Sequence, residues 1–287
     1  MINLRQQMPH YLRLMRFDKP VGIFLLLWPT LWAVWIAAKG APSFKIAVIF
    51  IAGSVVMRAA GCIVNDFADR HLDKHVQRTQ MRPLASGSVS VTEAMLLFAV
   101  LSLIAFTLVL LLNRLTVELA VIGILLALVY PFLKRFTHLP QLWLGVAFSW
   151  SIPMAFAATV GHVPAVAWLL FFAAVLWPIV YDTQYAMIDR EDDVKVGIKS
   201  TAILFGRYDR LMIGLLQGSV LLTFGLLGWY LRFNYWFYLG LLVALGLMCY
   251  QQFLIRHRKP PDCFAAFRNN NWVGFFIFLG ILLTYRN

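Results

Sequence analysis

Residues 163–193 read VPAVAWLLFFAAVLWPIVYDTQYAMIDREDD, and this stretch decides the kind of fold. Its first 19 residues, 163–181, contain no charged side chain, and about 20 apolar residues suffice to cross a bilayer as a helix. The next segment, residues 182–193, contains five carboxylates. The stretch therefore predicts a transmembrane helix that runs directly into an acidic segment at one membrane surface.

The composition of the whole chain extends this prediction beyond one segment. Hydrophobic residues make up 61% of the 287 residues, charged residues only 13%, and the mean hydropathy is +0.75. Soluble domains carry about 25% charged residues, so the composition excludes a soluble fold. Because the sequence contains no low-complexity segment and no soluble appendage, we interpret residues 1–287 as a single membrane-embedded domain.

Nine apolar runs can cross a bilayer as helices, although the last is short and could begin a turn earlier, within residues 269–271. Strand-length alternation, the signature of a membrane barrel, does not occur in the sequence. The predicted fold class is therefore all-α, a polytopic membrane protein of about nine transmembrane helices. The predicted spans are Val21–Ala38, Ile46–Val64, Ala94–Leu112, Leu115–Leu133, Leu139–Val160, Val163–Tyr181, Leu211–Leu231, Phe233–Ile255 and Trp272–Tyr285.

Lysine and arginine are distributed unevenly between the two sets of connections. Of these 25 residues, 20 flank the spans on the side of the N-terminus and five lie on the other side. Because positive residues accumulate on the cytoplasmic side, the N-terminus is predicted to face the cytoplasm. The net charge of +12 could indicate nucleic-acid binding, but a lipid bilayer explains short basic tracts between apolar runs better. We expect no nucleic-acid partner.

Eight of the 13 acidic residues fall in two short segments on the predicted cytoplasmic side. The first reads NDFADRHLD over residues 65–73. Spacings of four place Asn65, Asp69 and Asp73 on one helical face, with Asp66 beside them. Stacked carboxylates repel one another unless a cation lies between them, and such hard oxygen ligands suit Mg²⁺. A solvated turn is the simpler interpretation of either segment alone.

The second acidic segment follows the sixth predicted span. Offsets of 7 and 11 residues return to nearly the same helical direction, so Asp182, Asp189 and Asp193 also share a face. Two such segments at equivalent places favour a paired metal site over two independent solvated turns.

Basic and aromatic residues follow the acidic segments and end the fourth span. Carboxylates, metal ions and cations at one surface form a site for a polyanion such as diphosphate. The simpler alternative is that these cations only set the topology. The candidate anion-binding residues are Arg78, Arg82, Tyr130, Lys134, Lys195 and Lys199.

Arg58 differs from the other cations because it lies inside the second span. An ionisable residue within a span suggests a functional role, with snorkelling to the interface as the alternative. Arg58 precedes Asn65 by seven residues, or two helical turns, which places it about 10 Å deeper on the same face. It would therefore be a cation below a metal–diphosphate site.

Several further stretches resemble a known family. They are residues 14–20 (LMRFDKP), 28–32 (WPTLW), 57–62 (MRAAGC), 130–135 (YPFLKR), 150–154 (WSIPM) and 181–186 (YDTQYA). Together with the paired acidic segments, they are similar to the UbiA superfamily of intramembrane prenyltransferases, and in particular to its hydroxybenzoate-using branch. The resemblance covers nearly the whole chain, and the acidic segments show no departure from the family pattern.

The resemblance implies helices around a central cavity that opens sideways to lipid, with the acidic segments facing each other across its cytoplasmic mouth. It implies a multi-pass protein of the bacterial cytoplasmic (inner) membrane. Asn65 belongs to the acidic cluster, and Arg78, Arg82 and Lys134 match family positions that contact the diphosphate. The residues implied to hold Mg²⁺ against the diphosphate are Asp66, Asp69, Asp73, Asp182, Asp189 and Asp193.

The implied reaction transfers a polyprenyl group from polyprenyl diphosphate to 4-hydroxybenzoate, at the ring carbon ortho to the hydroxyl, in ubiquinone biosynthesis. Mg²⁺ and the cations would stabilise the departing diphosphate. Arg58 and Arg135 are the candidates for binding the carboxylate of the acceptor, and the predicted depth of Arg58 favours it. Asp189 is the candidate base for the phenol proton. No obligate protein partner is evident from the sequence.

Two alternatives compete with this interpretation. The same chemistry could act on another acceptor, such as a naphthoate, homogentisate, chlorophyllide or haem, and a panel of acceptors would decide. A cation-coupled transporter could also use clustered carboxylates, but transport sites lie near the bilayer midplane, often at broken helices. Here the acids lie at the ends of apolar runs, and Mg²⁺-dependent release of diphosphate would distinguish the enzyme from the transporter.

Overall fold

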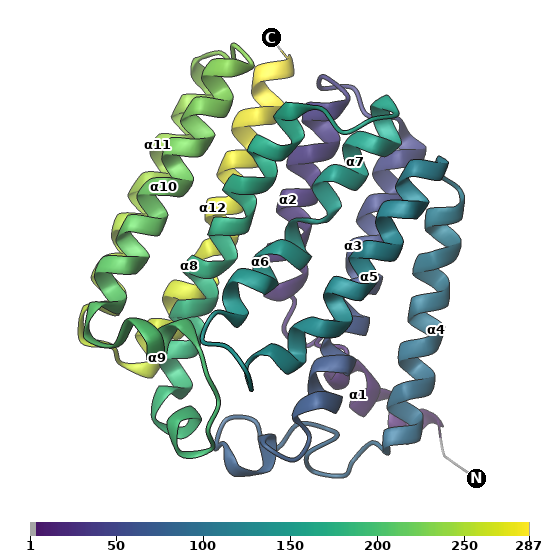
Figure 1. Cartoon of the computed structure of the whole chain (residues 1–287), viewed down its shortest axis with the longest axis vertical. Coiled ribbons are helices and arrows are strands. Elements are labelled where there is room, and N and C mark those ends of the chain that lie inside the picture. The colour runs from purple at the N-terminus through teal and green to yellow at the C-terminus, as the bar shows by residue number, and fades with distance from the viewer. Residues whose placement is uncertain (1–3, 287) are drawn as a thin grey trace.

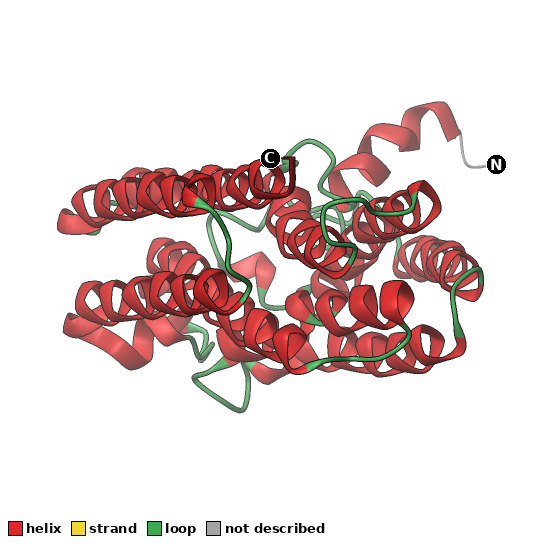
Figure 2. Ribbon diagram, turned by 90° about the horizontal axis from the view of Figure 1, so that it is seen from above, coloured by secondary structure: helices red, strands yellow, loops and turns green. Residues whose placement is uncertain are grey.

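The computed structural model describes residues 4–286, and this part of the chain consists of helices and connecting loops (Figures 1 and 2). Within it there is no strand, so the predicted all-α fold is confirmed. The helices of the membrane-spanning bundle are α2 Val21–Ala37, α3 Phe44–Asp69, α4 Val91–Leu110, α5 Arg114–Leu133, α6 Pro140–Ser149, α7 Ser151–Val160, α8 Ala165–Lys195, α10 Asp209–Tyr230, α11 Tyr235–Leu254 and α12 Pro260–Arg286. The short elements are α1 Leu4–Leu14, η1 Asp73–His75, α9 Thr201–Phe205, η2 Gly206–Tyr208 and η3 Ile255–His257.

Each of the nine predicted spans corresponds to a helix, or to a pair of consecutive helices, in the described part of the chain. Seven of these segments are long and apolar enough to cross a membrane by length and composition. The other two are α2, which is apolar but only 17 residues long, and α12, which carries polar residues in its first half. The chain is therefore a multi-span membrane protein, and its count of about nine helices is approximate.

The fifth predicted span is interrupted, contrary to the expectation of a continuous run. The helix breaks at Trp150, between α6 and α7. Pro153 lies three residues later, has no N–H to donate to Ser149, and its ring would collide with that carbonyl. Trp150 keeps helical dihedral angles (φ −64°, ψ −19°), so the two halves continue in one direction as a single interrupted span.

The ninth predicted span starts too late. The structure begins α12 at Pro260, before the earliest start predicted, which lay within residues 269–271. The polar stretch from Arg268 to Asn271 interrupts the apolar run, so the run alone does not predict the first part of this helix. In the fold these amides are used internally: Asn270 is fully buried, accepts a hydrogen bond from Trp177 Nε1 (3.1 Å) and donates one to Gln184 Oε1 (2.8 Å).

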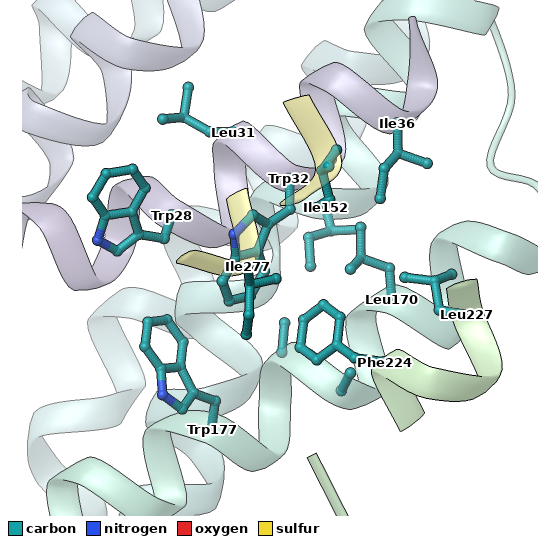
Figure 3. Close-up of a cluster of buried hydrophobic side chains, with 14 of the residues drawn as sticks. Trp28, Leu31, Trp32, Ile36, Ile152, Leu170, Trp177, Phe224, Leu227 and Ile277 are labelled. Carbon is teal, nitrogen blue, oxygen red and sulfur yellow. The ribbon is translucent and has the colours of Figure 1, made fainter. Parts of the chain in front are cut away.

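Tryptophan side chains pack the half of the bundle that contains α2, α8, α10 and α12 (Figure 3). Trp32 lies between Trp177 and Phe224, with ring centroids 5.2 and 5.0 Å away. Gly274 of α12 allows this close approach, because a Cβ there would lie 2.7 Å from the ring of Trp177. This cluster of buried aromatic side chains lies beside the active-site cavity, which α2, α8 and the first part of α12 also line.

The helix α1 was not expected from the apolar runs. Its Leu14 is fully buried, in a cluster with Ile63 and Leu84. Tyr11 donates a hydrogen bond to Glu93 at the start of α4 (2.7 Å). Figure 1 shows α1 at the same end of the bundle as the connection between α3 and α4 and the C-terminal end of α8. The N-terminal segment thereby lies beside the first acidic segment, where Arg16 pairs with Asp66.

Candidate active site

A cavity of about 740 Å³ lies among α2–α8. Its body is apolar, with Phe50, Ala105, Phe106 and Ile124 among the residues that line it. One end of the cavity is polar, and this end lies at the connection between α3 and α4. The residues predicted from the sequence that line this cavity are Arg58, Asn65, Asp66, Arg78, Arg82, Tyr130 and Asp182. An apolar body with one charged end suits an amphiphilic substrate with a polar head and a long apolar tail.

The first acidic segment lies at the cytoplasmic end predicted for α3, which continues as a helix to Asp69 and then turns into η1. Asp66 and Asp69 are each 1% exposed and Asp73 is 6% exposed, so these carboxylates do not form a solvated turn. Asp66 Oδ1 lies 2.7 Å from Arg16 Nη2 and 3.3 Å from Arg82 Nη1. Buried carboxylates need such partners, because an unpaired charge is costly to remove from water.

Asp69 and Asp73 have their own cationic partners. Lys134, at the end of α5, donates a hydrogen bond to Asp69 Oδ2, and Arg82 Nη1 lies 2.9 Å from Asp73 Oδ2. Burial raises the pKa of Asp73 above its ordinary value, although Arg82 opposes the shift. Burial acts to lower the pKa of Arg82, but Asp66 and Asp73 outweigh it and leave that pKa raised. Arg82 therefore remains a cation between two carboxylates.

The second acidic segment belongs to the continuous helix α8. Asp182 lines the cavity, and Asp189 lies nearly two turns further along. Arg78 Nε donates to Asp189 Oδ1 (2.9 Å), while Arg78 Nη2 lies 2.5 Å from Asp189 Oδ2. Arg78 also donates to the Tyr185 hydroxyl and lies over its ring. Because Arg78 follows the first acidic segment in the chain, this contact holds the two acidic segments against each other.

Arg58 lies on the cavity wall, two turns before Asn65 on α3. Its Nη1 donates to Cys62 Sγ (2.7 Å), and its guanidinium lies 5.8 Å from the centre of the Phe148 ring. Its Nε is buried and has no hydrogen-bond partner. Gly22 makes room for it, since a Cβ there would lie 2.7 Å from that Nε. A buried cation with an unused donor beside a cavity can bind an anionic ligand group.

The remaining predicted site residues lie off the surface of this cavity in the described chain. Arg135 donates to the Ala68 carbonyl at the end of α3. Lys199 Nζ donates to the Phe136 carbonyl (3.2 Å), and Lys195 pairs with Asp192 while 71% exposed. Asp193 is on α8 beyond Asp189. Arg135 and Lys199 thus brace the loops around the site, and Lys195 extends into solvent.

Sequence reasoning overlooked the part of the N-terminal segment that lines the cavity. Arg13, Arg16, Asp18 and Lys19 all lie on its surface, and Arg16 forms a two-pronged pair with Asp66. The topology argument alone had accounted for the positive charges of Arg13, Arg16 and Lys19. The signal in the sequence is the LMRFDKP stretch over residues 14–20, but nothing local in it shows that Arg16 meets an acid fifty residues later.

The residues present fit a divalent metal that is shared with a bound phosphate. In the described chain, no three acidic, histidine or cysteine side chains come close enough to hold a metal ion by themselves. Mg²⁺, however, usually takes only one or two protein carboxylates together with water and substrate phosphates. Asp69 Oδ1 is buried and has no hydrogen-bond partner, so it offers an unused oxygen of the right chemistry.

Membrane helices around a cavity with an apolar body, and two facing acidic segments at its charged end, define the class of intramembrane prenyltransferases. The chain belongs to the UbiA prenyltransferase family, whose family model matches residues 26–280. It is 99% identical over 287 residues to a protein of Coxiella burnetii called 4-hydroxybenzoate octaprenyltransferase, and the match spans 100% of both chains. It is 56% identical over 280 residues to a protein of the same name from Alkalilimnicola ehrlichii, covering 98% and 96% of the two chains.

Solved structures have the same fold. The structure of a UbiA homologue from Aeropyrum pernix matches with a TM-score of 0.80 and 25% identity, over 91% of this chain and 97% of the other. A homologue from Archaeoglobus fulgidus, bound to GPP and Mg²⁺, matches with a TM-score of 0.72 and 19% identity, over 96% and 99% of the chains. At that identity the second likeness concerns the fold alone.

Proposed function

We propose that this protein is a 4-hydroxybenzoate polyprenyltransferase, with the octaprenyl group that its relatives' name specifies as the transferred tail. It moves the polyprenyl group from polyprenyl diphosphate to the ring carbon ortho to the hydroxyl, giving 3-polyprenyl-4-hydroxybenzoate for ubiquinone biosynthesis. The observation that carries this proposal is the cavity, in which an apolar body leads to facing carboxylates and cations at one end.

The residues at this end divide between the diphosphate and a metal. We assign Arg78, Arg82 and Lys134 to the diphosphate oxygens, because arginine forks and ammonium groups bind phosphate strongly. Bound Mg²⁺ would supply further stabilisation of the charge on the leaving diphosphate. The residues that would hold it are Asp66, Asp69, Asp73, Asp182, Asp189 and Asp193, and we assign the neighbouring Asn65 to substrate binding.

The ion pairs in the ligand-free chain support this assignment. Asp69 and Asp189 are paired with Lys134 and Arg78, two cations that we assign to the diphosphate. Asp66 is paired with Arg16, which lines the substrate cavity. A diphosphate can attract those cations, which frees carboxylate oxygens for the metal. The protein therefore keeps its buried charges compensated both with and without substrate.

Arg58 is our candidate for the carboxylate of the aromatic acid. It lies on the cavity wall below the acidic segments, and its buried Nε has no other partner. Arg135 fits this role less well because its guanidinium is bound to the Ala68 carbonyl and lies off the cavity surface. With the carboxylate at Arg58, the hydroxyl end of the ring points toward the charged end of the cavity.

Asp189 remains our candidate for the base that takes the phenol proton. In the ligand-free chain its carboxylate accepts hydrogen bonds from Arg78. It can accept a proton only after Arg78 has moved to the diphosphate, which would couple deprotonation to substrate binding. We also propose that the N-terminus faces the cytoplasm in the bacterial inner membrane, on the basis of the lysine and arginine distribution.

One experiment tests the function directly. Membranes carrying the protein are incubated with labelled 4-hydroxybenzoate, Mg²⁺ and polyprenyl diphosphates of several lengths. We expect label to become lipid-extractable, and to remain water-soluble when EDTA is added or when Asp69→Asn replaces the wild type. If no tail length yields extractable label, the proposed function is wrong. Parallel incubations with a hydroxynaphthoate and with homogentisate test the alternative acceptors.

A second pair of variants tests the carboxylate site. Arg58→Ala should raise the KM for 4-hydroxybenzoate by at least about tenfold, because a hydrogen bond to a charged group contributes about 1.5–3 kcal/mol. The KM for the polyprenyl diphosphate should change little. Arg135→Ala is the matched control, and the opposite result, with Arg135→Ala raising the KM for the acid, would transfer the role to Arg135.

A further inference from the structure

A second depression lies at the same end of the bundle, on the outer side of α10 and α11, away from the active-site cavity. It has a volume of about 490 Å³ and is open to the surroundings. Three arginines line it, Arg207, Arg210 and Arg258, together with Gln252. The lining contains no carboxylate within the described chain. It is therefore a strongly positive concavity at a membrane surface.

The nearest carboxylate does not neutralise this concavity. Asp209 is fully buried behind it and binds Arg258 (2.8 Å) and Arg190. Among the described residues, neither Arg207 nor Arg210 forms an ion pair. The Nε of Arg210 is buried without any hydrogen-bond partner. Two guanidinium groups are thus left with uncompensated charge.

The depression is built into the fold. Arg258 adopts a left-handed backbone conformation (φ 54°), which is uncommon for a residue with a Cβ. Its Nη2 donates to the Arg207 carbonyl (3.0 Å) as well as to Asp209, which ties the start of α10 to the end of α11. Gln252 Nε2 donates to the Arg210 carbonyl (3.3 Å) and fixes the opposite wall. These contacts fix the backbone that carries Arg207 and Arg210 before any ligand arrives.

An apolar surface continues directly from the arginines. Leu211 and Leu215 line the depression, are 58% and 57% exposed, and lie on the outward face of α10. Gly214 lies between them in sequence and keeps the surface hollow beside Gln252. The site therefore offers hydrogen-bond donors for the anionic headgroup of an amphiphile. One helical turn deeper, it offers an apolar groove for the hydrocarbon chain.

We propose that this depression binds an anionic phospholipid of the leaflet on this side of the membrane. The lipid phosphate would lie against Arg207 and Arg210, and an acyl chain would lie along Leu211 and Leu215. Basic pockets between helices at a membrane surface suit anionic headgroups. A free phosphate shares the head chemistry but gains nothing from the leucines, so the apolar wall favours the lipid.

Retention of individual lipids, measured by native mass spectrometry, tests this site. The purified protein is loaded with phosphatidylglycerol or with phosphatidylcholine, and the bound lipids are counted at increasing collision energy. We expect phosphatidylglycerol to be retained preferentially. The double variant Arg207→Gln/Arg210→Gln should lose this preference by about fivefold for each arginine removed, the effect of one cation near an anionic surface.

The matched control is Arg256→Gln/Arg268→Gln, which removes the same charge at the same end from residues outside the depression. Equal losses in the two double variants would show nonspecific surface charge and overturn the site. Gly214→Leu fills the groove without changing the charge, and it should weaken phosphatidylglycerol retention while leaving competition by inorganic phosphate unchanged. If inorganic phosphate displaces the lipid from the wild type but not from the arginine double variant, and Gly214→Leu retains phosphatidylglycerol as well as the wild type does, the apolar wall contributes nothing. The site would then be one for free phosphate, and the lipid proposal would be wrong.

Discussion

Two clusters of charged side chains lie at the same end of the bundle. They differ in whether they border a cavity and in whether every carboxylate oxygen has a hydrogen-bond partner. The mouth cluster comprises Asp66, Asp69, Asp73 and Asp189 with Arg16, Arg78, Arg82 and Lys134. The Asp209 cluster comprises Asp209, Arg190 and Arg258. Both contain buried aspartates paired with cations. Only the mouth cluster borders a deep cavity and keeps a buried carboxylate oxygen, Asp69 Oδ1, without a partner.

In the Asp209 cluster, both carboxylate oxygens have hydrogen-bond partners. Both oxygens of Asp209 accept hydrogen bonds from Arg258, and the backbone N–H of Arg210 supplies another at 2.6 Å. Arg190 and Arg258, which bind Asp209, lie outside the active-site cavity, so a diphosphate bound there would not draw them away and free an oxygen for a metal. We therefore infer a structural role for Asp209. The comparison teaches that a buried ion pair alone does not mark a site. The mouth cluster differs in that it keeps an unused carboxylate oxygen on Asp69 and that other members of the cluster line the cavity. The two clusters should therefore respond in opposite ways to the same substitution.

The largest effect is expected for Asp69→Asn in the mouth cluster. It should lower product formation by at least about 100-fold, as removal of one preorganised electrostatic group typically does, while the protein stays folded. Product formation from labelled 4-hydroxybenzoate measures the loss, and thermal unfolding measures stability. Asp192→Asn, in the second acidic segment but paired only with the exposed Lys195, should retain near wild-type activity. Similar losses in both variants would contradict the assignment.

The same substitution in the other cluster should have the reverse effect. Asp209→Asn leaves the partly buried Arg190 and Arg258 without their carboxylate and should destabilise the protein by about 1–3 kcal/mol, the cost of leaving polar groups unsatisfied. Turnover per folded molecule should stay within about twofold of the wild type, since the cluster lies outside the cavity. A specific loss of turnover at unchanged stability would place Asp209 in the active site instead.

The contrast between the clusters also shows how far the sequence could lead. Apolar runs predicted the membrane helices correctly, and the spacing of acids drew attention to two segments near one end of the bundle, where Asp182 lines the cavity and Arg58 lies on its wall. These are local patterns, in which the relevant residues lie within a few helical turns. The excess of lysine and arginine on one side of the membrane, by contrast, does not distinguish Arg16 of the mouth cluster from Arg190 of the Asp209 cluster. Composition does not show which carboxylate a cation meets.

The parts that were missed depend on contacts between distant residues. Arg16 meets Asp66 across 50 positions, and Arg258 meets Asp209 across 49. The polar stretch at Asn270 was treated as a helix boundary because its partner Gln184 lies 86 positions away. A buried amide is compatible with a membrane helix only when such a partner exists, and periodicity cannot reveal it.

A moderate effect is expected for Arg78→Lys, which keeps the charge and removes the fork. Arg78 bridges the two acidic segments through Asp189 and Tyr185, and an ammonium group cannot reproduce that planar geometry. The KM for the polyprenyl diphosphate should rise by about tenfold, the lower range for a lost charge-assisted hydrogen bond. Steady-state kinetics with varied diphosphate measures this. An unchanged KM would show that Arg78 only spaces the two segments.

The smallest single effect is expected for Arg190→Gln, because Asp209 would still hold Arg258. We expect a loss of only about 0.5–1 kcal/mol in unfolding free energy, as for a partly exposed ion pair. Removing both arginines should cost more than the sum of the single losses, since the second removal leaves Asp209 as a buried and unpaired charge. Thermal unfolding of the two single variants and the double variant measures this coupling.

Adding Asp209→Asn to the double variant gives the sharper test of the comparison. If the carboxylate serves only to compensate the two arginines, removing all three charges should restore much of the lost stability, because no unpaired buried charge remains. The equivalent experiment in the mouth cluster adds Asp69→Asn to Lys134→Gln. This double variant should regain the stability that Lys134→Gln alone loses, but it should not regain activity. Recovered activity in that mouth variant would mean that Asp69 and Lys134 form a structural pair, and the distinction between the clusters would fail.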